Sequence, residues 1–344
     1  MSERITEKNT EGERRAIKGG AGRIKGKKFE GGASEYTDRR GKDRDTWFIE
    51  VSDMNPGFGV ALTKDRILFH DKSEFQEVEV FRNRLFGNVM LLDGLVMVTE
   101  KDEFVYHDMI THVPMCVNPN AKRILVIGAG DGGVVRELVK YPQIEHIDMV
   151  EIDRMVCDVA REYFPEISRD LSHDKVHLKF EDGVEFVRNS PDGEYDLIII
   201  DSTDPISVGE GLFTKKFYAD CHRVLKDEGI LVNQSEAPFI AEEDVKGIKD
   251  KLSSIFPIFR QYTGVVPTYP SSLWLFGFAS KKLDPLRNMK EKRWKKLGIK
   301  TDYYNTELHK ASFVLPNFVR EIAGNDVPLN NISGNEKMED KDEA

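Results

Sequence analysis

The chain has 344 residues, of which 40% are hydrophobic and 32% are charged, and its formal net charge is −10. This length suffices for one large domain or two unequal ones, and the net negative charge argues against a nucleic-acid partner. The three cysteines are widely spaced, which predicts a protein without disulfides in a reducing cytoplasm. No apolar run approaches the roughly 20 residues of a membrane span, and the N-terminus lacks the apolar core of a secretory signal, so neither is expected.

Both ends of the chain are poor in large apolar residues. Residues 1–45 are rich in Gly, Lys, Arg and Glu, and a segment that cannot bury apolar surface is expected to be a disordered tail. Residues 326–344 are interpreted as an acidic, frayed tail. The folded part of the chain is therefore expected between residues 46 and 325.

Residues 46–116 predict a small antiparallel β domain that ends in a connecting helix. Short, partly alternating segments such as FQEVEVFR, NVMLLDG and LVMVTEK are separated by turn residues. Asp93 and Gly94 lie between two apolar runs and predict a hairpin with a type I′ turn. Residues 102–116 have a helical pattern and lead into the next domain.

Residues 117–325 alternate strand-like and helix-like segments. Five apolar strands, RILVIGAG, HIDMVEID, VHLKFED, YDLIIID and GILVNQS, are separated by helical stretches, and two more strands follow a helix at 241–256. Strands this apolar are buried on both faces, which predicts a parallel sheet covered by helices. The expected fold is α/β, with a Rossmann-like, seven-stranded sheet of the methyltransferase type after the small antiparallel β domain.

Acidic residues follow four of these strands. Ligands of an open α/β sheet bind beyond the carboxyl ends of its strands. The acids at those ends are, in order, Asp131, Glu151 and Asp153, Asp182, and Asp201 and Asp204. Because the turn 128–133 and the loop 201–214 contain no Lys or Arg, the sequence predicts a strongly negative crevice.

Gly128, Gly130 and Gly133 form a G-x-G-x-x-G turn, which fits NAD and adenosyl cofactors equally well. Asp131 distinguishes these two kinds of cofactor. A carboxylate about 4 Å from a pyrophosphate repels it with an interaction energy of roughly 1 to 4 kcal/mol, whereas it attracts a sulfonium or an ammonium. The turn therefore argues against an NAD dehydrogenase. Asp131 could instead serve only as a helix cap.

The other acids also have structural interpretations. Glu151 could hold ribose hydroxyls or be an exposed acid at a strand end. Asp182 could accept a hydrogen bond from adenine or cap the helix GVEFVRN. The segment DSTDP at 201–205 carries either two functional acids or a turn that ends the strand. The loop 205–214 could be a lid or an ordinary mobile loop.

Together the motifs GAGDGG, EID, EDG and DSTDP resemble those of the polyamine aminopropyltransferases, the spermidine synthase family, and the similarity extends over about residues 47–325. The resemblance implies transfer of the aminopropyl group of decarboxylated S-adenosylmethionine to a diamine. Putrescine is the default acceptor, with agmatine or another amine as alternatives. The expected products are spermidine and 5′-methylthioadenosine, and the resemblance implies a homodimer or homotetramer.

The same resemblance implies two groups of substrate-binding side chains. Those that match donor-binding positions are Gln76, His107, Asp131, Glu151, Asp182 and Gly183. Those that match positions around the acceptor amine are Tyr106, Asp131, Asp201, Asp204, Gln234 and Tyr269, with Asp201 as the catalytic base. Ala129 stands where a glycine is common in the family. His107 and Asn55 stand where animal members carry Gln and Trp, although His is usual in bacterial-looking members, and Asn55 leaves the length of the acceptor open.

The expected reaction displaces a sulfonium, which is already a good leaving group, so neither a metal nor a redox cofactor is expected. Its difficulty lies in the acceptor, because freeing an ammonium with a pKa of about 10.4 at neutral pH costs roughly 4 to 5 kcal/mol. Burial and crowding by Asp131 and Asp204 are expected to raise the pKa of Asp201. His112 is expected to have no metal-ligand partner.

Two other functions remain open at this point. A methyltransferase would use the same sheet but would need neither Asp131 nor the paired acids at 201 and 204. A non-catalytic polyamine-binding protein would keep the fold without the reaction.

Overall fold

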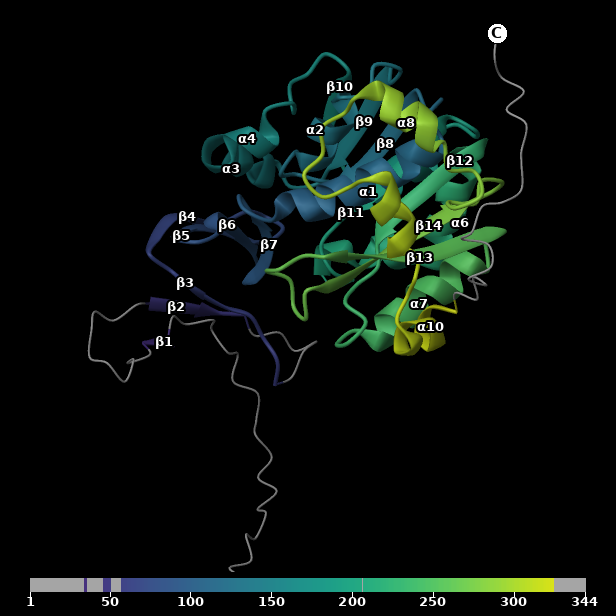
Figure 1. The fold of residues 1–344 in the computed structure, drawn as a ribbon. Coiled ribbons are helices and arrows are strands. Elements are labelled where there is room, and N and C mark those ends of the chain that lie inside the picture. Colours follow the sequence, from purple (N-terminus) through teal and green to yellow (C-terminus); the bar gives the residue numbers. More distant parts are fainter. Residues whose placement is uncertain (1–33, 36–45, 51–56, 206, 325–344) are drawn as a thin grey trace, which may run out of the picture.

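The computed structural model of the chain describes residues 34–35, 46–50, 57–205 and 207–324. They form a large α/β part and a small all-β part beside it (Figure 1). Asn55 and, apart from residues 34 and 35, the two expected tails lie outside the described residues. In the described ranges, no helix combines the length and apolar character that crossing a bilayer requires.

The large part is built on a seven-stranded sheet with the order β10-β9-β8-β11-β12-β14-β13. The strands are β8 (Arg123–Gly128), β9 (His146–Glu151), β10 (Val176–Phe180), β11 (Tyr195–Asp201), β12 (Leu225–Gln234), β13 (Ile258–Val265) and β14 (Leu273–Ser280). The first five in the sheet order are parallel, and β14 runs antiparallel to both β12 and β13. This is the predicted sheet with its closing hairpin.

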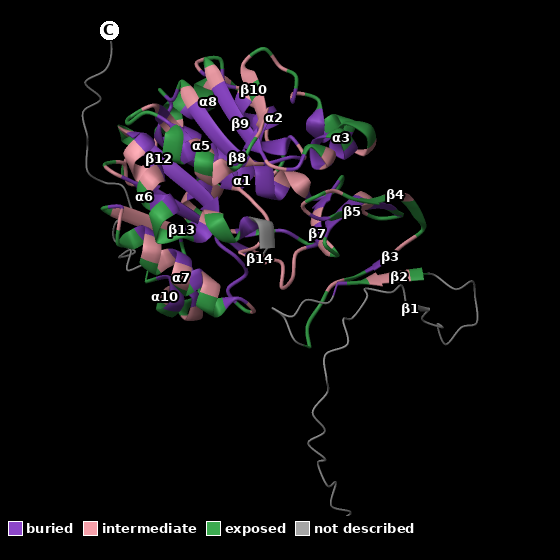
Figure 2. Cartoon of the chain, turned by 180° about the vertical axis from the view of Figure 1, so that it is seen from behind, coloured by how far each residue is buried: buried purple, intermediate pink, exposed green. Residues whose placement is uncertain are grey.

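Helices cover both faces of this sheet, as the apolar strands require. The helices are α1 (Glu103–Val117), α2 (Gly133–Val139), α3 (Arg154–Tyr163), α4 (Pro165–Ser168), α5 (Gly183–Asn189), α6 (Lys215–Val224), α7 (Glu242–Ser253), α8 (Glu291–Leu297), α9 (Thr306–Ser312) and α10 (Asn317–Ala323), with a 3₁₀ helix at Ser207–Phe213. In β8, Ile124 and Val126 pack on the side of α1 and α2, whereas Leu125 and Ile127 pack on the side of α5 and α6. The central strands are accordingly buried (Figure 2).

The small part contains two antiparallel sheets where the sequence predicted one β unit. One sheet is formed by β1 (Ser34–Glu35), β2 (Thr46–Ile49) and β3 (Ala61–Thr63), and the other by β4 (Arg66–Lys72), β5 (Glu77–Asn83), β6 (Gly87–Leu92) and β7 (Leu95–Thr99). Asp93 and Gly94 both have positive φ, 48° and 80°, so the expected type I′ hairpin turn joins β6 to β7.

The second of these sheets packs against the large part. Val78, Val80 and Met90 on one face contact apolar residues of α3 and the following turn. Phe81, Val89 and Leu91 on the other face pack toward the first sheet. The small part is therefore fixed to the large one by a shared apolar core.

The structure corrects three details of the sequence interpretation. Residues 34 and 35 pair with β2, so the tail expected at 1–45 includes a short strand. Helix α1, grouped above with the small domain, is buried from Val105 to Val117 in the core of the large part, and we place the boundary before it. The short helices α8, α9 and α10 were not predicted.

Candidate active site

A cavity of about 380 Å³ lies at the carboxyl ends of the parallel strands, between the large sheet and strands β6 and β7. Its described lining contains no Lys or Arg. The carboxylates that line it are Glu50, Asp102, Glu103, Asp131, Glu151, Asp182, Asp201, Asp204 and Glu236. Of the six acids predicted to form the negative crevice, all but Asp153 line this cavity; Asp153 is buried and accepts hydrogen bonds from Ser73 and Gln76 instead. The acidic lining favours a cationic guest.

The glycine turn brings two strand ends together because side chains would not fit there. Gly128 has φ +80°, and a Cβ on it would lie 2.0 Å from the backbone oxygen of Asp201. A Cβ on Gly133 would lie 2.2 Å from the His107 ring. The turn therefore lies directly against β11, and the imidazole packs on the first residue of α2.

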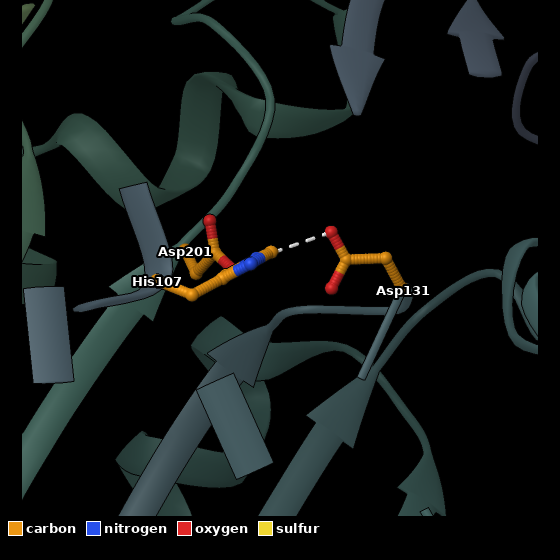
Figure 3. Close-up of side chains that lie close together, drawn as sticks. All are labelled: His107, Asp131 and Asp201. Atoms are coloured by element: carbon orange, nitrogen blue, oxygen red, sulfur yellow. Dashed lines mark ion pairs between the residues drawn. The ribbon is translucent and has the colours of Figure 1, made fainter. Parts of the chain in front are cut away.

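His107, Asp131 and Asp201 form one cluster, in which nitrogen and carboxylate atoms lie within 4.8 Å of one another. Figure 3 shows the three side chains facing each other. Nε2 of His107 lies 3.3 Å from Oδ2 of Asp131. Oδ1 of Asp131 accepts a hydrogen bond of 2.7 Å from the Gly133 N–H, so Asp131 caps the turn and faces the cavity at once.

The two aspartates of this cluster have opposite pKa shifts. Burial alone would raise the pKa of Asp131, but the His107 charge and hydrogen bond and the Gly133 N–H lower it below its usual value. Burial, followed by the Asp131 charge, raises the pKa of Asp201 to about 6, although His107 and the Tyr106 hydroxyl oppose the shift. Such a pair combines a fixed anion with a base that titrates near neutral pH.

A second group of acids lies around Asp204. Burial, followed by the Asp244 charge, raises the pKa of Asp204 to about 6. The Asp204 charge acts on Glu236 and Glu50, so the expectation that Asp204 crowds Asp201 is not confirmed; Asp201 ends the strand, whereas Asp204 lies on the loop that leaves it. Burial raises the pKa of Glu236 well above its usual value and that of Glu50 to about 7.

Glu236 and Glu50 were missed from the sequence. Glu236 lies two residues beyond β12, so the strand-end argument would have found it if extended to the fifth strand. Gln234 holds it in place: the Gln234 amide donates to Glu236 Oε1 at 2.8 Å and its oxygen accepts from the Glu236 N–H at 3.0 Å. Glu50 belongs to the small part, accepts a 2.9 Å bond from the Val96 N–H, and carries no sequence signal of its own.

The predicted donor-binding residues lie along another wall. Glu151 is buried, accepts a 2.8 Å bond from the Asp153 N–H, and has its pKa raised to about 7 by burial. The Gln76 amide donates to Asp153 Oδ2 at 3.0 Å. Asp182 accepts from the Val184 N–H at 2.7 Å, so its capping role is confirmed, and both it and Gly183 also line the cavity.

Two tyrosines close the site beside Asp201. The Tyr106 hydroxyl interacts with the Asp201 carboxylate, and its ring lies 6.0 Å from that of Tyr269. The Tyr269 hydroxyl donates to the Met97 carbonyl at 2.8 Å. Trp274 packs against Tyr269 and belongs to the core, while also lining the cavity.

The expectation for His112 is wrong. Its Nε2 lies 2.9 Å from Glu137 and 3.5 Å from Asp108, four residues earlier on α1. These are ligand-type side chains within 4.8 Å of one another. Asp108 was overlooked although it lies one helical turn away on α1, and Glu137 was overlooked because it comes from α2. They are engaged in ion pairs, however, and Asp108 accepts three backbone N–H bonds from residues 302–304.

Comparisons with known proteins agree with this geometry. Residues 103–291 match the spermine/spermidine synthase domain, and residues 46–100 match the spermidine synthase tetramerisation domain. Polyamine aminopropyltransferases of Clostridium perfringens and Clostridioides difficile are 55% and 54% identical over 282 and 278 residues, which cover 81% and 80% of this chain and 98% of each relative.

Solved structures give the same result. A spermidine synthase in complex with the transition state analogue AdoDATO and the spermidine synthase from Thermotoga maritima superpose with TM-scores of 0.79 and 0.78. Each is 37% identical and covers 86% of this chain and 98% of its own. Fold and site thus define a Rossmann-like transferase with an anionic cavity. The chain belongs to the polyamine aminopropyltransferase family, that of the spermidine synthases, and is an aminopropyltransferase.

Proposed function

We propose that the enzyme transfers the aminopropyl group of decarboxylated S-adenosylmethionine to putrescine, forming spermidine and releasing 5′-methylthioadenosine. The observation that carries this proposal is the pairing of Asp131 with Asp201 in one cavity that has no Lys or Arg in its described lining. A sulfonium and an ammonium both gain from such a lining, whereas a phosphate would be repelled.

The donor occupies the wall formed by the first three strand ends. Glu151 accepts hydrogen bonds from the ribose hydroxyls, and the turn at Asp182 and Gly183 borders the adenine. Gln76 fixes the same wall from the small part. Asp131 and His107 lie beneath the aminopropyl chain, where the Asp131 carboxylate attracts its ammonium. The distances above support these roles because the side chains line one continuous cavity.

The acceptor lies between the two acid groups. Asp201 takes a proton from the near ammonium, whose nitrogen then attacks the methylene carbon bound to sulfur. The carbon–sulfur bond breaks, its electron pair stays on sulfur, and the neutral thioether 5′-methylthioadenosine leaves. The far ammonium rests between Asp204 and Glu236, which Gln234 orients, while Tyr106 and Tyr269 enclose the carbon chain. Fixing both ends aligns the attack.

We further propose that the reaction needs neither a metal nor a bound cofactor, because the sulfonium leaves without a Lewis acid. The ring nitrogens of His107 are already paired with carboxylates. Activity is expected to survive prolonged treatment with EDTA, and its loss, with recovery on adding a divalent metal, would overturn this part of the proposal.

A homotetramer is the assembly that the match of residues 46–100 favours, with a homodimer as the alternative. Ile49, Phe58 and Ile67 of the small part expose 42%, 48% and 53% of their surface, which supplies apolar area for such contacts. The molar mass from light scattering separates these states.

All three cysteines are buried and free, which supports our expectation of a reducing, cytoplasmic environment.

The proposed function is tested by an acceptor screen. The enzyme is incubated with decarboxylated S-adenosylmethionine and, in turn, diaminopropane, putrescine, cadaverine, agmatine or spermidine, and methylthioadenosine is quantified. Putrescine is expected to give the highest kcat/KM. A higher value for another amine would replace putrescine as the acceptor, and methyl transfer from S-adenosylmethionine without methylthioadenosine release would overturn the proposal.

A further inference from the structure

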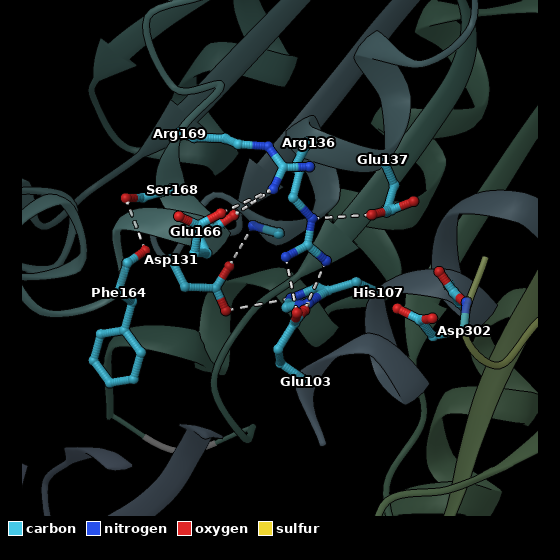
Figure 4. Close-up of polar contacts among 12 residues, drawn as sticks. Glu103, His107, Asp131, Arg136, Glu137, Phe164, Glu166, Ser168, Arg169 and Asp302 are labelled. Atoms are coloured by element: carbon cyan, nitrogen blue, oxygen red, sulfur yellow. Dashed lines mark hydrogen bonds and ion pairs between the residues drawn. The ribbon is translucent and has the colours of Figure 1, made fainter. Parts of the chain in front are cut away.

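A chain of alternating charges leads away from the cavity behind His107. His107 lies between two carboxylates, with Nε2 3.3 Å from Asp131 and Nδ1 2.5 Å from Glu103. Glu103 precedes His107 by one helical turn on α1, so the two side chains share a face. Only 3% of the His107 side chain is exposed. Figure 4 shows the imidazole held from both sides.

Arg136 of α2 continues this chain. Its two terminal nitrogens donate to the two oxygens of Glu103, each at 2.8 Å, which is the bidentate geometry of a strong ion pair. Its Nε donates to Glu137 at 2.9 Å, and Glu137 in turn contacts His112 and Lys140. Arg136 exposes 8% of its side chain and Glu103 9%, so Glu103 cannot turn away from His107 without leaving a buried guanidinium half-paired.

Titratable groups face His107 from each of the elements that pack around it. Glu103 and Tyr106 come from α1, Asp131 from the glycine turn and Asp201 from β11, with Arg136 of α2 behind Glu103. Each ring nitrogen thus meets a carboxylate oxygen, which can only accept. Nδ1 is hydrogen-bonded to Glu103 and Nε2 forms an ion-pair contact with Asp131. Because ionised carboxylates can only accept, two such neighbours favour the imidazolium form.

The pKa directions agree with this geometry. Burial alone would lower the pKa of His107, but Asp131 and Glu103 raise it well above its ordinary value. In the same way, His107 and Arg136 hold the pKa of Glu103 below its usual value against the effect of burial. The charge of His107 also opposes the rise in the pKa of Asp201.

We propose that Glu103 and Arg136 are positioning residues that keep His107 doubly protonated beside Asp131, so that Asp131 and Asp201 can both be ionised. Two adjacent buried carboxylates otherwise tend to share a proton, and a shared proton would block the base. The inference rests on the proposed roles of Asp131 and Asp201. The charge state of His107 is measurable without catalysis, so its failure is distinguishable from failure of the proposed function.

The first test is a pH titration of the histidine side chains by NMR in the full-length protein, with His107 assigned from the loss of its signal in His107→Gln. Unmodified His107 is expected to remain an imidazolium throughout the neutral range. In Glu103→Gln its pKa is expected to fall by about 1 to 3 units. A wild-type His107 that titrates near the ordinary value of about 6.5 would overturn the proposal even if the variant did not fold.

The second test is the pH profile of kcat at saturating substrates. In Glu103→Gln, kcat is expected to decline over the pH range in which NMR shows His107 losing its proton; we call this decline the break. The break should be absent from the double variant Glu103→Gln/His107→Gln, which has no imidazole to titrate. Glu137→Gln is the matched control, because Glu137 is also largely enclosed and bonds the same guanidinium but does not touch His107. It should lower stability without adding the break. The same break in Glu137→Gln, or a uniform loss of kcat at all pH values in Glu103→Gln, would reduce Glu103 to a structural role and overturn the proposal.

Discussion

The two ends of the cavity carry several acids each but hold their charge differently. At the Asp131 end, His107 supplies a cation within the protein, and the pKa of Asp131 lies below its usual value. At the Asp204 end, the described lining offers no cation to Asp204, Glu236 or Glu50, and burial raises the pKa of all three.

The two ends therefore differ in the pH at which their acids ionise in the empty protein. An acid with a built-in partner is ionised before the substrate arrives. An acid buried without one keeps its proton up to a higher pH, and an ammonium placed beside it favours the ionised form.

Replacing Asp201 by Asn removes the base and leaves the rest of the cavity charge in place. We expect kcat to fall by about 10²- to 10⁴-fold, the usual contribution of a general base, while the Kd of the donor changes little. Single-turnover kinetics and calorimetric donor titrations measure the two quantities. Asp158→Asn, an exposed site on α3, serves as the control. An equal loss of donor binding would contradict the base role.

Replacing Glu236 by Gln removes one carboxylate from the far end without changing its size. The KM for putrescine is expected to rise about ten- to a hundredfold, the value of one hydrogen bond to a charged group. The donor KM should be unaffected. The same change at Glu242, exposed at the start of α7, should do nothing. If the acceptor KM stayed constant, Glu236 would not contact the amine.

The far end should also make acceptor binding depend on pH. Burial raises the pKa of Asp204 to about 6 and that of Glu50 to about 7, whereas unfolded carboxyls titrate near about 4. The empty folded protein therefore binds these protons more tightly than the unfolded chain does, and its stability falls as pH rises through that interval. Putrescine should offset this loss.

The increase in melting temperature on adding putrescine is thus expected to be larger at pH 8 than at pH 6. Calorimetry in buffers of different ionisation enthalpy should detect protons released on binding. Glu236→Gln should reduce that release. An increase in melting temperature that is independent of pH would show that the far acids are already ionised in the empty protein.

The smallest effect is expected for Tyr269→Phe, which removes the bond to the Met97 carbonyl. The free energy of unfolding should fall by about 0.5 to 1.5 kcal/mol, measured by urea denaturation. The acceptor KM should change less than in Glu236→Gln. An equally large change in KM would assign the hydroxyl to the amine instead of Met97.

The parts that followed from the sequence were those encoded by neighbouring residues. Apolar strands with an acid at the end place Asp131, Glu151, Asp182 and Asp201 at one edge, since parallel strands end on the same side of a sheet. The glycine turn was equally local, and its tight contact with Asp201 explains why Gly128 is required.

What the sequence did not provide depends on residues far apart in the chain. Glu50 reaches the cavity only because the small part folds over that cavity. Glu236 lies just beyond β12, and its own backbone has an unusual φ of +67°. The ion pair between Glu103 and Arg136 joins two helices that begin at different loops. The helices α8, α9 and α10 have seven residues each, too few for a clear hydrophobic period.

The contact between Gln76 and Asp153 has a consequence for how this enzyme can be divided. Asp153 accepts from Ser73 and Gln76 of the small part, caps α3, and through its backbone N–H holds Glu151. The small all-β part thus contributes residues to the lining of the cavity and fixes its glycine-turn side. A shortened chain beginning at α1 would lack a wall of that cavity, so supplying subunit contacts from elsewhere should not restore its turnover.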